Sequence, residues 1–295
     1  MRRLFNDSHI MNIPSPFRMV VAQIITIIRA RRVRKHYGLM GGGSPLKKWT
    51  RLQGEAILAH LKTDCTNIRL FDAYSYSEPL IHQVISKLTE GDVEKIIAVP
   101  LYPHYSYATL GSVYADLEKA RHKYNLNNRL RIIQPFFEHP QFIRASIELL
   151  RNALGKIDTG ASYQVIFSAH ALPQNFIDRG DPYRHQVERT VGLILKEFPI
   201  ENWALAYQSK IGPVAWMQPS TIEAVRTAAK QGIKQLAVIP IGFVCDHFET
   251  LYELDIELAA IARESGIEKF VRGEVFNIND TFIKMLVELI SQEFQ

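Results

Sequence analysis

One stretch near the carboxyl end of the chain combines acidic residues and a histidine with apolar residues. The stretch GFVCDHFETLYELDIELA, residues 242–259, carries six such groups: Asp246, His247, Glu249, Glu253, Asp255 and Glu257. Glu249, Glu253 and Glu257 are spaced four apart, so they lie along one side of a helix. No lysine or arginine occurs from 245 to 262. Crowded carboxylates raise one another's pKa and can pass protons or hydrated cations, so we expect a proton or metal path here. A solvated acidic helix face is the alternative.

A second histidine stands at the end of a short apolar run. His170 follows VIFSA in the stretch FSAHALPQNFIDRGDPY. Its ordinary pKa lies near neutrality, which suits the removal of protons from a substrate. A core histidine with satisfied hydrogen bonds is the alternative. The later GDPY turn, with Asp181 as a helix cap and Pro182 in the first turn, is expected to fix the loop rather than to take part in chemistry.

Two further stretches could contact a flat or anionic ligand. YQSKIGPVAWMQPST offers Ser209 and Lys210 for an anionic edge and Trp216 for stacking on a ring, although a capped loop would explain it as well. PLYPHYSYATLGS carries tyrosines, Tyr105 among them, that can wall an apolar ligand. A packed aromatic corner is the alternative there. The glycines of LMGGGSPLKKW match neither a P-loop nor a dinucleotide-binding fingerprint, so they indicate a tight turn before a helix.

Short apolar runs alternate with helical patterns along the whole chain. The runs predict strands at 68–76, 94–103, 130–137, 163–173, 203–210 and 234–244. Helical patterns lie at 45–62, 78–89, 111–124, 140–154, 183–197, 219–231, 246–264 and 280–293. Strands separated by helices predict parallel sheets that are covered on both faces, which is the α/β fold class.

The strands fall into two groups, so we expect two doubly wound, Rossmann-like domains that face a cleft. The N-terminal domain is expected to comprise 1–137 and 275–295. The C-terminal domain, 138–274, is expected to carry His170 and Glu249. In open parallel sheets, ligands bind outside the carboxyl ends of the strands, where the polar residues described above occur.

The composition is that of a globular protein rather than a disordered one, with 47% hydrophobic and 22% charged residues among 295. Two cysteines occur, Cys65 and Cys245, and they form no paired metal motif. A reducing compartment is therefore the expectation, with no disulfide framework. A secretory signal peptide is not indicated, because no small-residue cleavage site follows the apolar run near the start.

The net charge of +5 is concentrated near the amino end, where eleven basic residues precede Glu55: Arg2, Arg3, Arg18, Arg29, Arg31, Arg32, Arg34, Lys35, Lys47, Lys48 and Arg51. Nucleic acid is one partner for such a segment. The interleaved apolar run Val20 to Ile28, too short to span a bilayer, instead favours contact with an anionic membrane surface. A core helix with a basic exposed end is the alternative. We expect no nucleic-acid partner.

Taken together and in order, five motifs resemble those of the ferrochelatase family, whose members insert ferrous iron into a porphyrin. They are GGGSPLKKWT, YPHYSYATLGS, FSAHALPQNFIDRGDPY, YQSKIGPVAWMQPST and VIPIGFVCDHFETLYELDIE, and they extend over nearly the whole chain. The chemistry suits these residue types. An apolar macrocycle must be bound and bent, two pyrrole protons must be removed, and neutral imidazole and carboxylate suit ferrous iron.

The resemblance implies a role for each matching residue. His170 is the proton acceptor and a metal contact, and Glu249 faces it, assisted by His247. Asp246, Glu253 and Glu257 form the proton or metal path. Contacts with the porphyrin are implied for Met11, Tyr105, Trp216, Phe243, Ser209 and Lys210. The segment VVAQIITIIRARR matches the apolar lip that leans on the membrane in the family.

The chain departs from the family in three places. It lacks the initial strand of the type VLLMNLGGP, so we expect the first strand of the first domain to be missing and Met1 to be a misassigned start or a truncation point. Gly38 and Leu39 replace a pair of arginines, and the basic residues 31–35 are expected to contact the propionates instead. The carboxyl end has no cysteine extension, so the resemblance implies no iron–sulfur cluster.

The resemblance thus implies a lyase that inserts Fe²⁺ as a substrate into protoporphyrin IX, with no permanently bound cofactor. A cytoplasmic protein in peripheral contact with the inner face of the cytoplasmic membrane is expected. Coproporphyrin III is the alternative substrate, and sirohydrochlorin is a more distant one. A non-catalytic tetrapyrrole-binding protein is the alternative of another class, because a pocket without its first strand could bind without turnover. A two-domain solute-binding protein would require a secretion signal.

Overall fold

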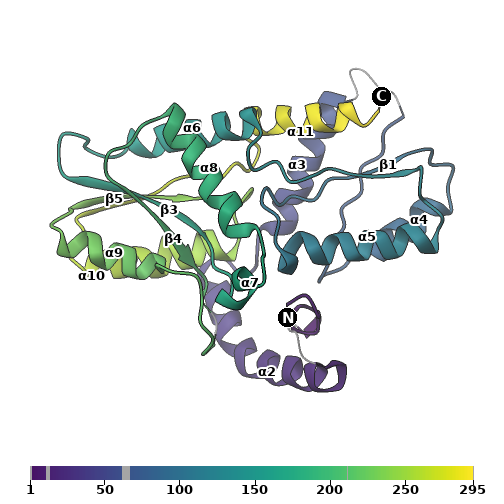
Figure 1. The fold of residues 1–295 in the computed structure, drawn as a ribbon, viewed down its shortest axis with the longest axis horizontal. Helices are drawn as coiled ribbons and strands as arrows, with labels where there is room; N and C mark the ends of the chain where they lie inside the picture. Colours follow the sequence, from purple (N-terminus) through teal and green to yellow (C-terminus); the bar gives the residue numbers. More distant parts are fainter. Residues whose placement is uncertain (1, 11–13, 62–66, 211, 295) are drawn as a thin grey trace. The chain divides into compact units, whose positions relative to one another are not determined.

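The computed structural model describes residues 2–10, 14–61, 67–210 and 212–294 (Figure 1). The chain divides into two compact units. Unit 1 comprises Met1–Gly42, Thr50–Pro135 and Ile283–Gln295, and unit 2 comprises Gly43–Trp49 and Phe136–Phe282. The chain therefore passes between the units after residues 42, 49, 135 and 282, whereas the sequence predicted boundaries after 137 and 274 alone.

Unit 2 is built on a parallel sheet of four strands in the order β4-β3-β5-β6. The strands are β3 (Tyr163–His170), β4 (Trp203–Gln208), β5 (Gln235–Pro240) and β6 (Lys269–Arg272). Residues Val165 to Phe167 in the central strand are fully buried. Such a continuous apolar run is typical of a strand that is covered on both faces. The sheet confirms the predicted α/β class.

Helices cover both faces of this sheet (Figure 1). Helices α9 (Thr221–Lys230) and α10 (Ala259–Glu264) lie on one side, and α6 (Pro140–Leu154) and α8 (Tyr183–Glu197) lie on the other. The short helix α7 (Gln174–Asp178) follows β3. Val225 and Ala228 of α9 pack with Ile166 and Leu236 of the sheet in one apolar cluster. This packing holds the strands in register, and so fixes the positions of the residues at their carboxyl ends.

Unit 1 contains a parallel pair of strands, β1 (Ile96–Ala98) and β2 (Leu130–Ile132), in its described part. Its helices are α1 (Arg2–Phe5), α2 (Ser15–Leu39), most of α3 (Leu46–Leu61), α4 (Ile81–Thr89), η1 (Tyr107–Gly111), α5 (Ser112–Lys123) and most of α11 (Asp280–Gln292). A cluster of buried apolar side chains from α4, α5, β1 and β2 forms its core.

The strand predicted at 68–76 is not formed. Tyr74 makes an isolated bridge with Leu80, and its backbone groups bond locally to Pro79 and Ile81. A strand needs a neighbour that pairs its backbone groups, and this segment satisfies Tyr74 within its own turn. Conversely, the sequence prediction missed β6, whose four residues KFVR begin and end with charges.

Helix α2 contains the apolar run that the sequence places at the membrane or in the core. Several of its large apolar side chains are exposed: Phe17, Met19, Val20, Ile24 and Ile27. Ala22, by contrast, is completely buried. None of the helices, as far as the chain is described, is long and apolar enough to cross a membrane.

Candidate active site

The strand ends of unit 2 bring His170 and Gln208 side by side. His170 is the last residue of β3 and pairs in register with Gln208, the last residue of β4. Nδ1 of His170 lies 2.6 Å from the backbone carbonyl oxygen of Ala171. A carbonyl oxygen only accepts, so Nδ1 carries the hydrogen of the neutral ring, and the lone pair is on Nε2. This tautomer leaves His170 a ring nitrogen that can accept a proton.

The loop after β5 delivers the second histidine. Gly242 has a φ of +91°, a conformation in which glycine carries little strain, and this turns the chain out of the strand. Phe243 is 8% exposed, and the centroid of its ring lies 4.9 Å from that of His247 in an edge-on contact. Phe243, predicted to contact porphyrin, therefore also supports the ring of His247.

The acidic stretch forms a π-helix, η2 (Glu249–Leu258), which continues into α10. The sequence predicted a helix over 246–264 but not its type. Helices of this kind are rare, are mostly limited to one turn, and occur frequently at functional sites. A turn closed by i→i+5 bonds holds more than four residues, so Glu249, Glu253 and Glu257 still return to nearly the same side. The predicted alignment of the three carboxylates is therefore retained in η2.

Glu249 and His247 are in contact at the start of η2. Oε2 of Glu249 lies 3.4 Å from Nε2 of His247, and the side chains are 29% and 19% exposed. Burial works to raise the pKa of Glu249, but the charges of His247 and His170 outweigh it, so the pKa lies below its ordinary value. Glu249 is thus a carboxylate at neutral pH. The charge of His170 therefore acts on the carboxylate of Glu249.

His247 is the weaker base of the pair. Burial lowers its pKa more than the carboxylate of Glu249 raises it, and the charge of His170 acts in the lowering direction. Its Nδ1 is buried, with no hydrogen-bond partner among the described residues. A neutral ring is therefore expected at pH 7.

Glu253 lies four residues after Glu249 in η2 and is bonded by residues at the end of β4. Its Oε2 accepts hydrogen bonds from Oγ of Ser209 at 2.5 Å and from Nε2 of Gln208 at 3.1 Å. Burial raises the pKa of Glu253 to about 7, and the charges of Glu249 and Glu257 act in the same direction against the two hydrogen bonds. A carboxyl group with this pKa can gain and lose a proton near neutral pH.

A buried hydrogen-bond chain orients Gln208. Oγ of Ser168, itself fully buried, donates to Oε1 of Gln208 at 2.8 Å and lies 3.1 Å from Oγ1 of Thr221. The amide nitrogen of Gln208 therefore points to η2, where it donates to the backbone oxygen of Glu249 at 2.9 Å. The sequence predictions gave Ser168 no role. A polar residue inside an apolar strand was the signal that could have identified it.

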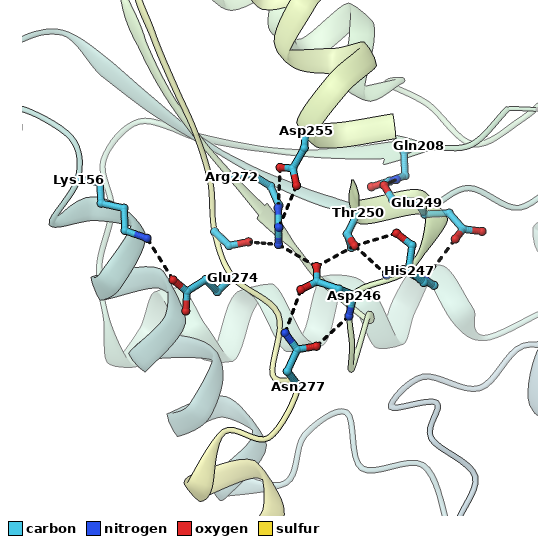
Figure 2. Close-up of polar contacts among 11 residues, drawn as sticks. Lys156, Gln208, Asp246, His247, Glu249, Thr250, Asp255, Arg272, Glu274 and Asn277 are labelled. Carbon is cyan, nitrogen blue, oxygen red and sulfur yellow. Dashed lines mark hydrogen bonds and ion pairs between the residues drawn. The ribbon is translucent and has the colours of Figure 1, made fainter. Parts of the chain in front are cut away.

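The carboxylate of Asp246 is bonded to neighbours outside the row of glutamates (Figure 2). Its Oδ1 accepts from Thr250 at 2.9 Å and pairs with Nη1 of Arg272 at 3.2 Å. Its Oδ2 accepts from Nδ2 of Asn277 at 2.9 Å. Three donors thus occupy the carboxylate that the sequence assigned to the proton or metal path.

The remaining predicted contacts lie in several places. The segment around Trp216 pairs with the segment around Pro173, so the loops after β3 and β4 are joined. Hydrogen bonds from Ser220 lower the pKa of Glu223, and the charge of Lys210 acts in the same direction. Tyr105 belongs to unit 1, where its ring packs near Tyr107 and Tyr114. Met11 lies outside the described residues.

Unit 2 thus brings together His170, Gln208, Ser209, Phe243, His247, Glu249 and Glu253. In the described part of the chain, no group of three or more His, Cys, Asp or Glu side chains is arranged to hold a metal ion. The site therefore combines a base, a carboxylate and a carboxyl group of near-neutral pKa, but no cage for a resident metal. Such a set can accept protons and can contact a metal in transit.

Solved structures with a similar fold are chelatases. The structure titled SirB from Bacillus subtilis with Fe3+ superposes with a TM-score of 0.61 at 12% identity, covering 85% of this chain and 91% of that chain. CbiX, titled the terminal enzyme for biosynthesis of siroheme in denitrifying bacteria, gives a TM-score of 0.55 at 14% identity, covering 85% and 94%. At these identities the likeness shows the fold alone. It is the chelatase fold.

Sequence comparison gives the particular family. The family model for ferrochelatase matches residues 1–294. The ferrochelatase of Aquifex aeolicus is 38% identical over 291 residues, which are 98% of this chain and 92% of the relative. That of Geotalea daltonii is 36% identical, covering 97% and 89%. The chain belongs to the ferrochelatase family. It is a metal chelatase, a lyase of porphyrin and heme biosynthesis with a tetrapyrrole substrate, as the motifs predicted.

Proposed function

We propose that this chelatase inserts Fe²⁺ into protoporphyrin IX, with release of two protons, as the terminal step of heme biosynthesis. The observation that carries the proposal is the pairing of a base with an acidic row in unit 2. In its neutral form His170 has a lone pair on Nε2, and once protonated its charge acts to lower the pKa of Glu249, which begins the row that continues to Glu253.

In the proposed reaction, the two N–H bonds of the porphyrin break and Fe²⁺ forms bonds to all four pyrrole nitrogens. Nε2 of His170 accepts the two pyrrole protons one after the other, and passes the first towards solvent before it accepts the second. The charge balances, because two protons leave as one divalent ion enters. Imidazole and carboxylate are suitable transient ligands for ferrous iron, so His170 and Glu249 are assigned the contacts with the metal. His247 assists Glu249 through the 3.4 Å contact.

Protons or hydrated metal are proposed to move along Glu249, Glu253 and Glu257. The support is the pKa of about 7 at Glu253, which allows it to exchange protons at physiological pH. Asp246 is left out of this path, because its carboxylate is occupied by Thr250, Arg272 and Asn277.

Several ligand contacts are proposed on the family resemblance. Phe243, Trp216 and Tyr105 would contact the macrocycle, together with Met11, and Lys210 its anionic edge. Ser209 is a weaker candidate, because its hydroxyl is bonded to Glu253. Fe²⁺ is a substrate in this scheme, and no permanently bound cofactor is proposed. No iron–sulfur cluster is proposed, because the two cysteines, Cys65 and Cys245, form no paired cysteine motif.

Membrane contact is proposed for α2. Its exposed apolar side chains, Phe17, Val20 and Ile27 among them, suit an interface, and the basic residues around them suit anionic headgroups. The protein would then act in the cytoplasm, peripherally on the inner face of the membrane. An apolar lip also favours protoporphyrin IX over coproporphyrin III, which carries more carboxylates.

Metalation of two porphyrins under anaerobic conditions tests the proposal. Protoporphyrin IX and coproporphyrin III are each mixed with Fe²⁺, or with Zn²⁺ as a probe, and the Soret band is followed. The proposal predicts metalation, with the higher kcat/KM for protoporphyrin IX. A preference for coproporphyrin III would reassign the substrate. Binding of both porphyrins without metalation would establish the non-catalytic alternative.

A further inference from the structure

The π-helix η2 is held by residues from both edge strands of the unit 2 sheet. β4 and β6 are the two edges in the order β4-β3-β5-β6. Gln208, the last residue of β4, donates to the backbone oxygen of Glu249. Arg272, the last residue of β6, contacts the same segment through two aspartates. Residues 246–255 are thus held by contacts from both edges of the sheet.

The guanidinium of Arg272 contacts both Asp246 and Asp255 (Figure 2). In the sequence, these two residues lie on either side of Glu249 and Glu253. Nε and Nη2 donate to the two carboxylate oxygens of Asp255 at 2.8 and 3.0 Å. Nη1 lies 3.2 Å from Oδ1 of Asp246 and donates to the backbone oxygen of Gly273. The Arg272 side chain is 14% exposed, and that of Asp246 is 15% exposed. A planar, bidentate contact of this kind fixes orientation as well as charge.

From Asp246 the contacts continue to the backbone of the site. Oγ1 of Thr250 donates to Oδ1 of Asp246 and accepts the backbone N–H of His247 at 3.0 Å. The buried Thr250 therefore links Arg272 to the residue that contacts Glu249. A shift of the Asp246 carboxylate would move this amide, and with it the ring of His247.

Asn277 fixes Asp246 from a second direction. Its Oδ1 accepts the backbone N–H of Asp246 at 2.9 Å, and its Nδ2 donates to Oδ2 at 2.9 Å. Because backbone and side chain are both bound, Asp246 has little rotational freedom. The carboxylate is thereby held where Arg272 and Thr250 meet.

We propose that Arg272 is a positioning residue for metal insertion: by bridging Asp246 and Asp255 it fixes the start of η2, and so the placement of His247 and Glu249. This rests on the proposed function, in which those two side chains act at the reacting centre. Arg272 itself contacts neither substrate nor metal. Asp246 belongs to the same group of contacts. It joins Arg272 to Thr250 and does not carry protons.

The variant Arg272→Lys tests the geometry separately from the charge. Lysine keeps the positive charge near the two aspartates, but one ammonium cannot reproduce the planar bidentate contact and the second pairing together. Loss of groups that orient metal-contacting side chains costs about 10- to 100-fold in activity or metal affinity. We expect kcat for metalation to fall about tenfold in Arg272→Lys, with the Kd for porphyrin within about twofold of the wild-type value.

Two control variants separate positioning from general stability. Lys156→Gln removes the exposed ion pair between Lys156 and Glu274, which lies two residues after Arg272 in sequence. It should leave kcat unchanged. Ile143→Ala empties a buried position in α6, and it should lower the melting temperature without the selective loss of kcat. The loss of kcat is compared with the loss of melting temperature in each variant. If Ile143→Ala and Arg272→Lys showed the same loss of kcat for the same loss of melting temperature, the proposal would be overturned.

Amide hydrogen exchange provides a readout that does not depend on turnover. The proposal predicts faster exchange in peptides covering 246–255 of Arg272→Lys, and unchanged exchange there in Lys156→Gln. Unchanged exchange in Arg272→Lys would contradict the positioning role. If the wild-type protein failed to metalate porphyrin, the proposed function would fail, but the exchange result would still decide whether Arg272 fixes η2.

Discussion

The side-chain amide of Gln208 donates a hydrogen bond of 3.1 Å to the carboxylate of Glu253. The two residues are 45 positions apart in sequence and meet because β4 ends beside η2. The same amide also holds the backbone oxygen of Glu249. One neutral side chain therefore sets the positions of two acidic residues in the site. The hydrogen bonds favour the charged form of Glu253, yet burial prevails and its pKa rises to about 7.

The raised pKa of Glu253 predicts a specific dependence of stability on pH. The folded protein holds this proton more tightly than the unfolded chain, so stability falls as the pH rises from about 4.5 to about 7. Glu253→Gln removes this loss. Relative to wild type, the variant should gain up to about 3 kcal/mol between pH 4.5 and pH 8. Urea unfolding at both pH values measures the difference. A constant offset between the two proteins would show that Glu253 does not titrate in this range.

His170→Ala should abolish metalation and leave porphyrin binding largely intact. The variant lacks the Nε2 that accepts the pyrrole proton, whereas the surrounding strand is unchanged. Absorbance titration gives the Kd for porphyrin, and the Soret shift gives the rate. His185→Ala, at an exposed position of α8, is the matched control and should behave as wild type. Near-normal turnover in His170→Ala would remove His170 from its assigned role.

Glu249→Gln should slow insertion by about 10²- to 10⁴-fold, the range typical of groups that assist proton transfer. The amide keeps the shape of the side chain but cannot carry its charge beside His247 and His170. Glu264→Gln, at an exposed position near the end of α10, is the control for a lost carboxylate. If both variants changed the rate equally little, the solvated acidic face considered for this stretch would be the better interpretation.

Ser168→Ala should reduce both stability and activity. Oε1 of Gln208 would lose its buried donor, at a cost of about 1–3 kcal/mol. The amide would also be free to rotate, so Glu253 would be less well held and kcat should fall several-fold. Ser146→Ala is a matched control, since the buried hydroxyl of Ser146 donates to Phe142 within α6. An equal loss of kcat in the two variants would argue against the orienting role of Ser168.

The parallel sheet of unit 2 could be predicted because its strands are short, apolar and separated by helical patterns. The position of His170 at a strand end agrees with the rule that ligand-binding residues lie outside the carboxyl ends of parallel strands. Strand β6 was hidden because KFVR has polar ends and only two central apolar residues. The predicted strand at 68–76 had the right composition, but Tyr74 satisfies its backbone groups locally. The composition of a segment indicates that it could form a strand, but the strand forms only if a neighbouring strand pairs with its backbone groups.

Within the site, residue types were predictable and partners were not. The spacing of Glu249, Glu253 and Glu257 indicated a row of carboxylates, but no pattern distinguishes the i→i+5 bonds of a π-helix from those of an α-helix. Asp246 resembled its acidic neighbours in sequence. Its pairing with Arg272 depends on where β6 ends, which is a tertiary relationship. Only such long-range contacts distinguish Asp246, which is bonded to Arg272, from the glutamates of the row.

Proton release during metal insertion tests the central claim most directly. Protein, protoporphyrin IX and Fe²⁺ are mixed anaerobically in weak buffer with a pH indicator, and the Soret band is recorded in the same stopped-flow experiment. We expect two protons to be released for each porphyrin that the wild-type protein metalates, and we expect neither signal with His170→Ala. Metalation by His170→Ala at the wild-type rate, with the same two protons released, would contradict this expectation.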